Sequence, residues 1–295
     1  MSKTVFIIVT SKCNKLCPFC YYKQDSFRAK NDKLDSFNFH NLVKNLKGAG
    51  FNELTVTGGE PLLKKELSLK IIKEADKENF KINLSTNGTL LDQQTIEDLK
   101  KVNKFKIYLS SRYIDSFRDF FLEELSAVFS ITIIHVVTRK NFNDLEKIIR
   151  IADKSKIKLI IQPAYINEAN QHFNQLSLKN LNNQERVDFE NILKKWADKN
   201  KKEAYFNLIR SYYLKDKSGY PNSCHTGADD IVIDSDGSVF PCFHRQDLKA
   251  GNVLGGSLRD ILIRIKGLSK QIGNASCFGE YCIPLCISSH TYWTL

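Results

Sequence analysis

Short apolar runs alternate with longer amphipathic segments from residue 1 to about residue 200. The runs are rich in Ile, Val and Leu and nearly continuous in hydrophobicity, which is typical of strands buried on both faces of a parallel sheet. The amphipathic segments between them have the periodicity of helices, for which Asp92 and Asn143 are candidate N-caps. We predict strands at 4–10, 54–57, 81–85, 105–110, 131–137 and 158–162 and helices at 39–47, 64–79, 92–102, 115–128 and 143–154.

Regular alternation of strands and helices predicts an α/β fold, in which helices cover the outside of a parallel sheet. Six such units predict a partial (β/α)6 TIM-like barrel. A further helix is predicted at 180–202. Beyond it, the short apolar segments 231–233 and 238–240 flank the turn signal Asp236-Gly237 and predict a hairpin. We therefore divide the chain into a barrel domain, residues 1–205, and a smaller domain, residues 206–295.

Composition narrows the class of protein. The excess of 44 Lys and Arg over 33 Asp and Glu is spread along the chain, as on a solvated, lysine-rich exterior. The apolar run at residues 5–9 is too short for a signal peptide, and no stretch approaches the roughly 18 apolar residues of a membrane span, so we expect a cytoplasmic protein without a membrane partner. In that reducing compartment, the eight cysteines indicate metal ligands or reactive thiols rather than disulfides.

Cys13, Cys17 and Cys20 have the spacing C-x3-C-x2-C directly after the first predicted strand. Thiolates are soft ligands that suit iron-sulfur clusters, and three of them leave one iron of a four-iron cluster open to a substrate or cofactor. The alternative is a zinc site. Zinc sites more often pair one C-x2-C knuckle with a second knuckle, which is absent nearby in the sequence.

The segment CNKLCPFC resembles the signature loop of the radical S-adenosylmethionine (SAM) superfamily, with Phe19 at its aromatic position. The resemblance implies that the open iron of a [4Fe-4S] cluster binds SAM, and that reduction cleaves SAM to a 5'-deoxyadenosyl radical. Phe19 would then lie against the adenine. Gly58, Gly59, Glu60 and Pro61, after the second predicted strand, resemble the family's GGE motif, which binds the SAM amino group.

Other strand ends resemble the family less specifically. Ser85 and Asn87 belong to an S-T-N-G segment after the third strand, which the resemblance places near the SAM ribose. Ser110 ends the fourth strand, and Gln162 ends the sixth near the expected adenine position. Many relatives with auxiliary clusters read S-x-D-G at the end of the fourth strand, whereas this chain reads Ser110-Ser111-Arg112. Ordinary turn or cap residues are the alternative for each of these polar positions.

The C-terminal cysteines resemble a SPASM/Twitch module, an auxiliary iron-sulfur domain of many radical SAM enzymes. Cys224 and Cys242 flank Gly237 with the spacing C-x12-G-x4-C, and three more cysteines follow. A full module has two clusters, but five cysteines suffice for one, so we expect a Twitch-like domain with one auxiliary [4Fe-4S] cluster. Its ligands would be Cys224, Cys242 and two of Cys277, Cys282 and Cys286. We expect Cys277 to be the spare thiol or a hydrogen donor, with an exchange of roles with Cys282 left open.

The resemblance implies abstraction of hydrogen from a substrate C–H bond. A peptide undergoing crosslinking, epimerisation or oxidation is the expected substrate, and an aminocyclitol or sugar undergoing dehydrogenation or epimerisation is the alternative. A reducing partner such as flavodoxin or ferredoxin is implied. A zinc-stabilised nucleic-acid-binding protein would use the net charge of +11, but the basic residues form no patch interleaved with aromatic residues, which disfavours nucleic acid as a partner.

Overall fold

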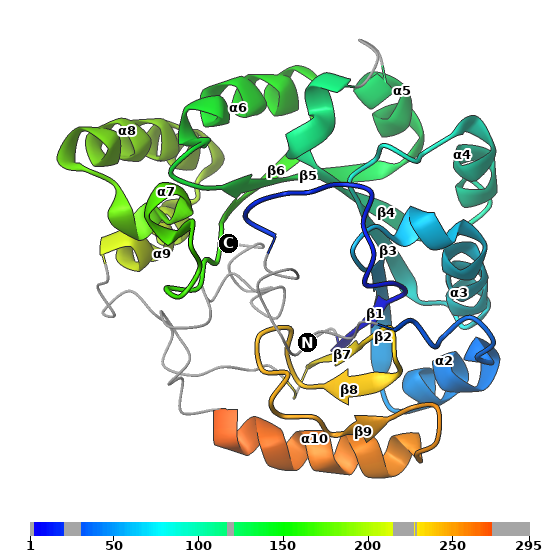
Figure 1. Ribbon diagram of the computed structural model, residues 1–295. Helices are drawn as coiled ribbons and strands as arrows, with labels where there is room; N and C mark the ends of the chain where they lie inside the picture. The colour runs from blue at the N-terminus through cyan, green and yellow to red at the C-terminus, as the bar shows by residue number, and fades with distance from the viewer. Residues whose placement is uncertain (1–2, 21–30, 117–120, 215–226, 228, 273–295) are drawn as a thin grey trace.

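The computed structural model describes residues 3–20, 31–116, 121–214, 227 and 229–272. A curved sheet forms its centre, with the strand order β6-β5-β4-β3-β2-β1-β7-β8-β9 among the described residues. The first six strands are parallel, in chain order (Figure 1). They are β1 (Lys3–Ile8), β2 (Phe51–Thr57), β3 (Lys81–Thr86), β4 (Phe105–Ser110), β5 (Ser130–Val137) and β6 (Lys158–Pro163).

Helices connect these strands and cover the outside of the curved sheet (Figure 1). Their apolar faces pack on alternate strand residues, such as Leu54, Ile82 and Ile107, in one continuous core. The helices are α2 (Phe39–Gly48), α3 (Lys65–Lys77), α4 (Gln93–Leu99), α5 (Phe121–Val128) and α6 (Leu145–Lys154). The partial TIM-like barrel predicted from the sequence is thus confirmed. No described helix has the length and apolar character needed to cross a membrane.

The helix boundaries differ from prediction at two starts. Asp92 caps α4 as predicted, because its carboxylate accepts the Thr95 backbone N–H at 2.8 Å. Asn143 is not the N-cap of α6, because the chain enters that helix through a 3-10 turn, Phe142–Asp144, and Asp144 precedes α6. The fourth helix was predicted at 115–128, but residues up to Ser116 form a 3-10 segment and α5 starts at Phe121.

Beyond β6, the chain adds α7 (Phe173–Leu176), α8 (Asn183–Asn200) and α9 (Glu203–Leu214). Helix α8 corresponds to the predicted helix at 180–202, whereas α9 was not predicted. Trp196, Tyr205 and Tyr213 belong to a second apolar cluster that joins these two helices to β5 and β6. Helix α9 runs across the domain boundary that we placed after residue 205.

The predicted hairpin forms β7 (Asp230–Ile233) and β8 (Ser238–Phe240), followed by β9 (Gly251–Asn252) and α10 (Leu258–Ile272). Gly237 has φ +84°, a left-handed conformation that glycine adopts readily, and this allows the turn. Strand β7 also pairs in parallel with β1, with Val232 opposite Phe6. The second region of the chain therefore extends the sheet of the barrel, a pairing that the sequence did not predict.

Candidate functional site

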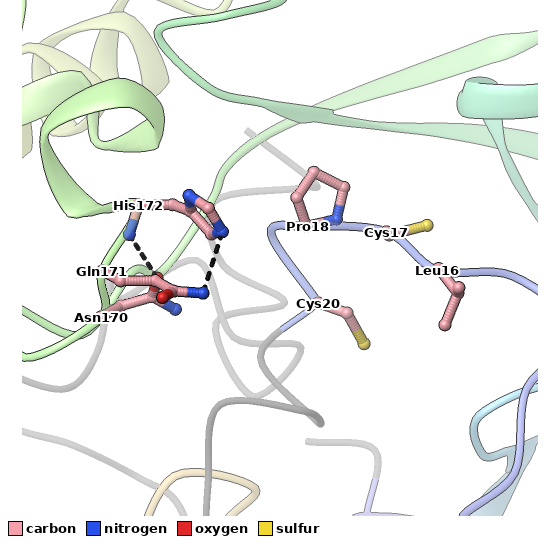
Figure 2. A pocket seen from close by; sticks show the side chains of 7 residues that line it. All are labelled: Leu16, Cys17, Pro18, Cys20, Asn170, Gln171 and His172. Atoms are coloured by element: carbon pink, nitrogen blue, oxygen red, sulfur yellow. Dashed lines mark hydrogen bonds between the residues drawn. The ribbon is translucent and has the colours of Figure 1, made fainter.

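Cys13, Cys17 and Cys20 lie on the loop that follows β1, at the carboxyl edge of the parallel strands, and all three are partly buried. A backbone hydrogen bond from Cys20 N to Cys17 O, 3.1 Å, turns the end of this loop, which we call the cysteine loop, residues 9–20. The loop borders a pocket of about 450 Å³. Figure 2 shows Cys17, Pro18 and Cys20 on one side of this pocket and Asn170–His172 on the other. The predicted thiol ligands therefore border open space.

The glycines of the predicted GGE motif hold the cysteine loop by its backbone. Gly59 N donates to Thr10 O at 2.8 Å, and Glu60 N donates to Lys12 O at 2.9 Å. A Cβ atom on Gly59 would lie 2.2 Å from Lys12 O, and one on Gly58 would lie 2.7 Å from Thr10 O. Only glycine permits this approach, so the two sequence motifs are parts of one structure.

Asp32 supports the same loop from the segment before α2. Its carboxylate accepts the Thr10 hydroxyl at 2.6 Å and the Ser11 backbone N–H at 3.0 Å. Burial acts to raise the pKa of Asp32, but these hydrogen bonds, together with Ser235 and the Lys64 charge, hold the pKa below its usual value. The carboxylate therefore stays ionised. We missed this residue because nothing in its local sequence distinguishes it from a polar loop residue.

Glu60 is buried, with 0% of its surface exposed. One oxygen accepts Leu62 N at 3.1 Å and Thr86 Oγ1 at 2.7 Å, and the other accepts Asn87 N at 2.8 Å. Burial raises the pKa of Glu60, and the three hydrogen bonds partly oppose that shift. In this structure the carboxylate joins the ends of β2 and β3, while Pro61 opens the 3-10 turn Pro61–Lys64.

Asn87, from the predicted S-T-N-G segment, reaches the cysteine loop. Its Nδ2 lies 2.9 Å from Asn14 Oδ1 and 3.9 Å from Cys13 Sγ. Thr89 completes the cluster, because Asn14 Nδ2 donates to its hydroxyl at 3.0 Å. A side-chain amide beside a thiolate ligand can donate to sulfur, and such hydrogen bonds tune cluster potentials.

Phe19 packs at the carboxyl ends of β5 and β6, in an apolar cluster with Val136 and Ala164. The Arg112 guanidinium carbon lies 5.2 Å from the centre of its ring, a cation–π distance. Arg112 stands at the Asp position of the S-x-D-G segment that the resemblance implies, so this chain has a cation there instead. The sequence marked the departure but did not predict the contact.

The remaining predicted residues fall on the inner face of the sheet. Leu84, Leu109 and Ile161 pack outward into the cores, and because side chains alternate along a strand, their neighbours Ser85, Ser110 and Gln162 face inward. All three are partly exposed. His135 on β5 is different, because it shares the outer face with Ile133 and Val137. It is buried on the outer side, and its Nδ1 lies 2.8 Å from Ser111 Oγ.

Cys242 is the one predicted auxiliary ligand within the described residues, and it is partly buried. The next residue, Phe243, packs on Phe6 of the inner barrel face with ring centres 5.1 Å apart, and the cluster they form also includes Cys20. His244 contacts Tyr165 after β6, with ring centres 5.2 Å apart. The loop after β8 therefore lies against the barrel near the cysteine loop. Cys224, Cys277, Cys282 and Cys286 lie outside the described residues.

The donor set of the cysteine loop fits an iron-sulfur cluster. Among the described residues, no three or more His, Cys, Asp or Glu side chains converge as the ligands of a single metal ion do. A four-iron cluster is larger, and each of three thiolates binds a different iron. Three thiols on one loop, fixed by a glycine cradle and bordering open space, therefore suit a cluster with one open iron.

Comparison with protein families gives two matches. A model described as the radical SAM superfamily matches residues 7–176, and one described as an iron-sulfur cluster-binding domain matches residues 224–279. Residues 7–176 include the whole cysteine loop, the glycine motif and strands β2 to β6. The second match includes Cys242 and the predicted ligands that lie outside the described residues.

Individual proteins resemble parts of the chain. A GTP 3',8-cyclase of Clostridium acetobutylicum is 31% identical over 63% of this chain, and the match spans 51% of that enzyme, about half its length. A GTP 3',8-cyclase of Clostridium botulinum is 23% identical over 85% of this chain and 84% of that enzyme.

Two solved structures share the fold. Streptococcus suis SuiB bound to its precursor peptide SuiA has a TM-score of 0.65 at 16% identity and covers 88% of this chain and 64% of its own. BtrN, in complex with AdoMet and 2-DOIA, has a TM-score of 0.51 at 17% identity, with 93% and 88% covered. At these identities the likeness concerns the fold alone.

Proposed function

Because the chain belongs to the radical SAM superfamily, we propose that Cys13, Cys17 and Cys20 hold a [4Fe-4S] cluster with SAM at its open iron. When bound, this pair supplies the electron transfer and the hydrogen-abstracting species for reaction at an unactivated substrate C–H bond. The observation that carries the proposal is the junction of the cysteine loop with Gly59 and Asn87, which brings three family motifs together at one edge of the sheet.

The chain's own residues have distinct parts in this proposal. Gly58 and Gly59 set the position of the cysteine loop, because their backbones approach it more closely than any side chain allows. Glu60 fixes the end of β3, and so places Asn87 beside Cys13. Phe19 offers an aromatic face to the cofactor's adenine.

The polar residues on the inner face complete the cofactor site. Ser85, Ser110 and Gln162 lie near the carboxyl ends of β3, β4 and β6, where ligands bind in barrels of this kind. We assign Ser85 and Asn87 to the ribose side and Gln162 to the adenine side. These roles rest on the family resemblance and on the shared inner-face position.

An auxiliary [4Fe-4S] cluster is proposed for the second domain, residues 206–295, with Cys224, Cys242 and two of Cys277, Cys282 and Cys286 as ligands. The match to an iron-sulfur cluster-binding domain supports it. The packing of Phe243 on Phe6 supports its position beside the barrel interior, from which it could accept an electron from a substrate radical.

For the substrate we propose a peptide, and SuiB, solved with its precursor peptide, is an example of this fold with such a ligand. A small molecule is the second candidate, favoured by the relatives named for a reaction of GTP. A small redox protein such as flavodoxin or ferredoxin is the proposed electron donor. Leu16 on the cysteine loop is 85% exposed and offers an apolar contact for it.

The test replaces Cys13, Cys17 and Cys20 together by alanine. Under dithionite, the anaerobically reconstituted wild type should form 5'-deoxyadenosine from SAM, whereas the triple variant should form none, because no ligands remain for the cluster. The matched control is Cys242→Ala, which should retain 5'-deoxyadenosine formation. Formation of 5'-deoxyadenosine by the triple variant would refute the proposal.

A further inference from the structure

On β4 the inner face of the barrel is polar and partly exposed, unlike its outer face. Along β4 the outward residues Phe105, Ile107 and Leu109 are buried, whereas the inward residues Lys106, Tyr108 and Ser110 are partly exposed. Neighbouring strands continue this polar face. Asn83 on β3 donates to Glu53 Oε1 at 2.8 Å and to Thr55 Oγ1 at 3.1 Å, both on β2.

Three lysines share this inner face near the amino ends of their strands. Lys81 begins β3, Lys106 is the second residue of β4 and Lys158 begins β6. Strand pairing aligns Lys158 with Thr132, and Thr132 with Tyr108, so Lys158 lies on the same side of the sheet as Lys106. Leu54 and Ile231 pack in the outer core, so the acidic residues beside them, Glu53 on β2 and Asp230 on β7, face inward. The described inner face therefore keeps a positive balance.

Of these three lysines, Lys106 is the best placed to bind an anion within the barrel. Its Nζ lies 5.5 Å from the centre of the Tyr108 ring, and Tyr108 is two residues nearer the carboxyl edge of the sheet. Among the described residues, Lys106 Nζ contacts the Tyr108 ring but has no hydrogen-bond or ion-pair partner, although the side chain is partly buried. A partly desolvated ammonium without a hydrogen-bond or ionic partner is costly, and an anion relieves that cost.

The surrounding charges agree with this interpretation. Burial lowers the pKa of Lys106, Glu53 opposes that shift, and Lys158 and Lys81 add to it. The carboxylate of Glu53 is also engaged by Asn83 at 2.8 Å, so it is held on the β2 side. An incoming anion would interact with the field of three lysines, and its binding would favour the charged form of Lys106.

We propose that Lys106, with Lys81 and Lys158 around it, binds a carboxylate or phosphate group of the substrate inside the barrel. The proposal rests on the proposed function, because it takes the substrate to enter from the carboxyl edge beside the cysteine loop. Lys106 lies four residues before Ser110, about 13 Å along the strand at the usual rise. The substrate is therefore elongated, with its anionic group remote from the reacting C–H bond.

The test measures binding of simple oxyanions to the reconstituted, SAM-loaded enzyme by isothermal titration calorimetry. Inorganic pyrophosphate is the phosphate probe and N-acetylglutamate the carboxylate probe. Binding of pyrophosphate alone indicates a phosphorylated small molecule, and binding of N-acetylglutamate alone indicates a carboxylate such as that of an acidic peptide. Either supports an anion site, whereas binding of neither at millimolar concentration overturns it.

Variants locate the site. Lys106→Met should weaken probe binding at least about tenfold, because one charge-assisted contact is lost, and Lys106→Arg should restore most of it. Glu53→Gln should strengthen binding, since it removes an opposing charge. The control is Lys44→Met, the same substitution at an exposed position on α2. Equal binding by wild type and Lys106→Met, or equal loss in Lys44→Met, overturns the proposal.

The same preparation separates this inference from the proposed function. Formation of 5'-deoxyadenosine by the wild type tests the cluster and SAM, and it requires no oxyanion. If the wild type forms no 5'-deoxyadenosine but binds oxyanions in a Lys106-dependent way, the proposed function alone is contradicted. Normal product without Lys106-dependent binding would contradict the anion site alone.

Discussion

At the scale of single residues, Glu60 illustrates how the environment sets the task of a side chain. A carboxylate after two glycines was expected to meet the ammonium of SAM. In the structure it is fully buried and accepts hydrogen bonds from Leu62, Thr86 and Asn87. Its burial raises its pKa, so its stability contribution is present at low pH and is lost as the pH rises through the folded-state pKa.

His135 provides a prediction with the opposite sign. Burial lowers its pKa to about 4, so folding favours the neutral ring. The contribution of His135 to the free energy of unfolding is complete above the pKa of the unfolded state, about 6.5. It is lost as the pH falls through the folded-state pKa near 4, by about 3 kcal/mol at most. Urea unfolding between pH 7 and pH 4 should therefore show a smaller loss of stability in His135→Gln than in the wild type. Parallel pH dependences of the two proteins would contradict this assignment.

At the scale of elements, the cysteine loop depends on the turn after β2. The predicted strands and helices each arise from local periodicity, but the loop acquires its shape from Gly58, Gly59 and Asp32, which lie at other points in the chain. Its three cysteines come from adjacent sequence, so their motif was recognisable. Asp32 lies 22 residues from Thr10, the residue it binds.

Gly59→Ala should therefore disrupt the loop and leave the barrel folded. The added Cβ would lie 2.2 Å from Lys12 O, which is backbone and cannot move aside without displacing the loop. We expect the iron content after reconstitution to fall by about four per chain, the content of one cluster, with the far-ultraviolet circular dichroism of the wild type.

Gly48→Ala is the matched control for that experiment. Gly48 ends α2, and a Cβ there would meet nothing within 4 Å, so the iron content should not change. If Gly59→Ala loads as much iron as Gly48→Ala, the close approach of the two motifs is not what positions the ligands.

At the scale of the whole molecule, the second region is built onto the barrel through β7. Parallel pairing of β7 with β1 adds the hairpin to the barrel sheet, and Phe243 and His244 then contact Phe6 and Tyr165. The loop after β8 thus covers part of the inner face beside the cysteine loop. This packing places Cys242 on the side of the barrel where we propose that the substrate lies.

Two four-iron clusters per chain should give about eight iron and eight sulfide after anaerobic reconstitution. Cys242→Ala should reduce the iron by up to about four, because it removes one of the four thiolate ligands proposed for the auxiliary cluster. Cys277→Ala should keep the full iron content if Cys277 is the spare thiol, and its product then shows whether that thiol donates hydrogen. About four iron in the wild type would contradict the auxiliary cluster.

The sequence alone determined the strands, most helices and the cluster motif, because hydrophobic periodicity and neighbouring cysteines are local properties of the chain. It also placed the glycine motif and Asn87 at strand ends. Only the tertiary structure decided that Glu60 accepts a hydrogen bond from Thr86, that Asp32 binds the cysteine loop, and that β7 pairs with β1. It also decided which lysines share the inner face. These contacts join residues far apart in the chain, and their free energies depend on burial and register that no local pattern encodes.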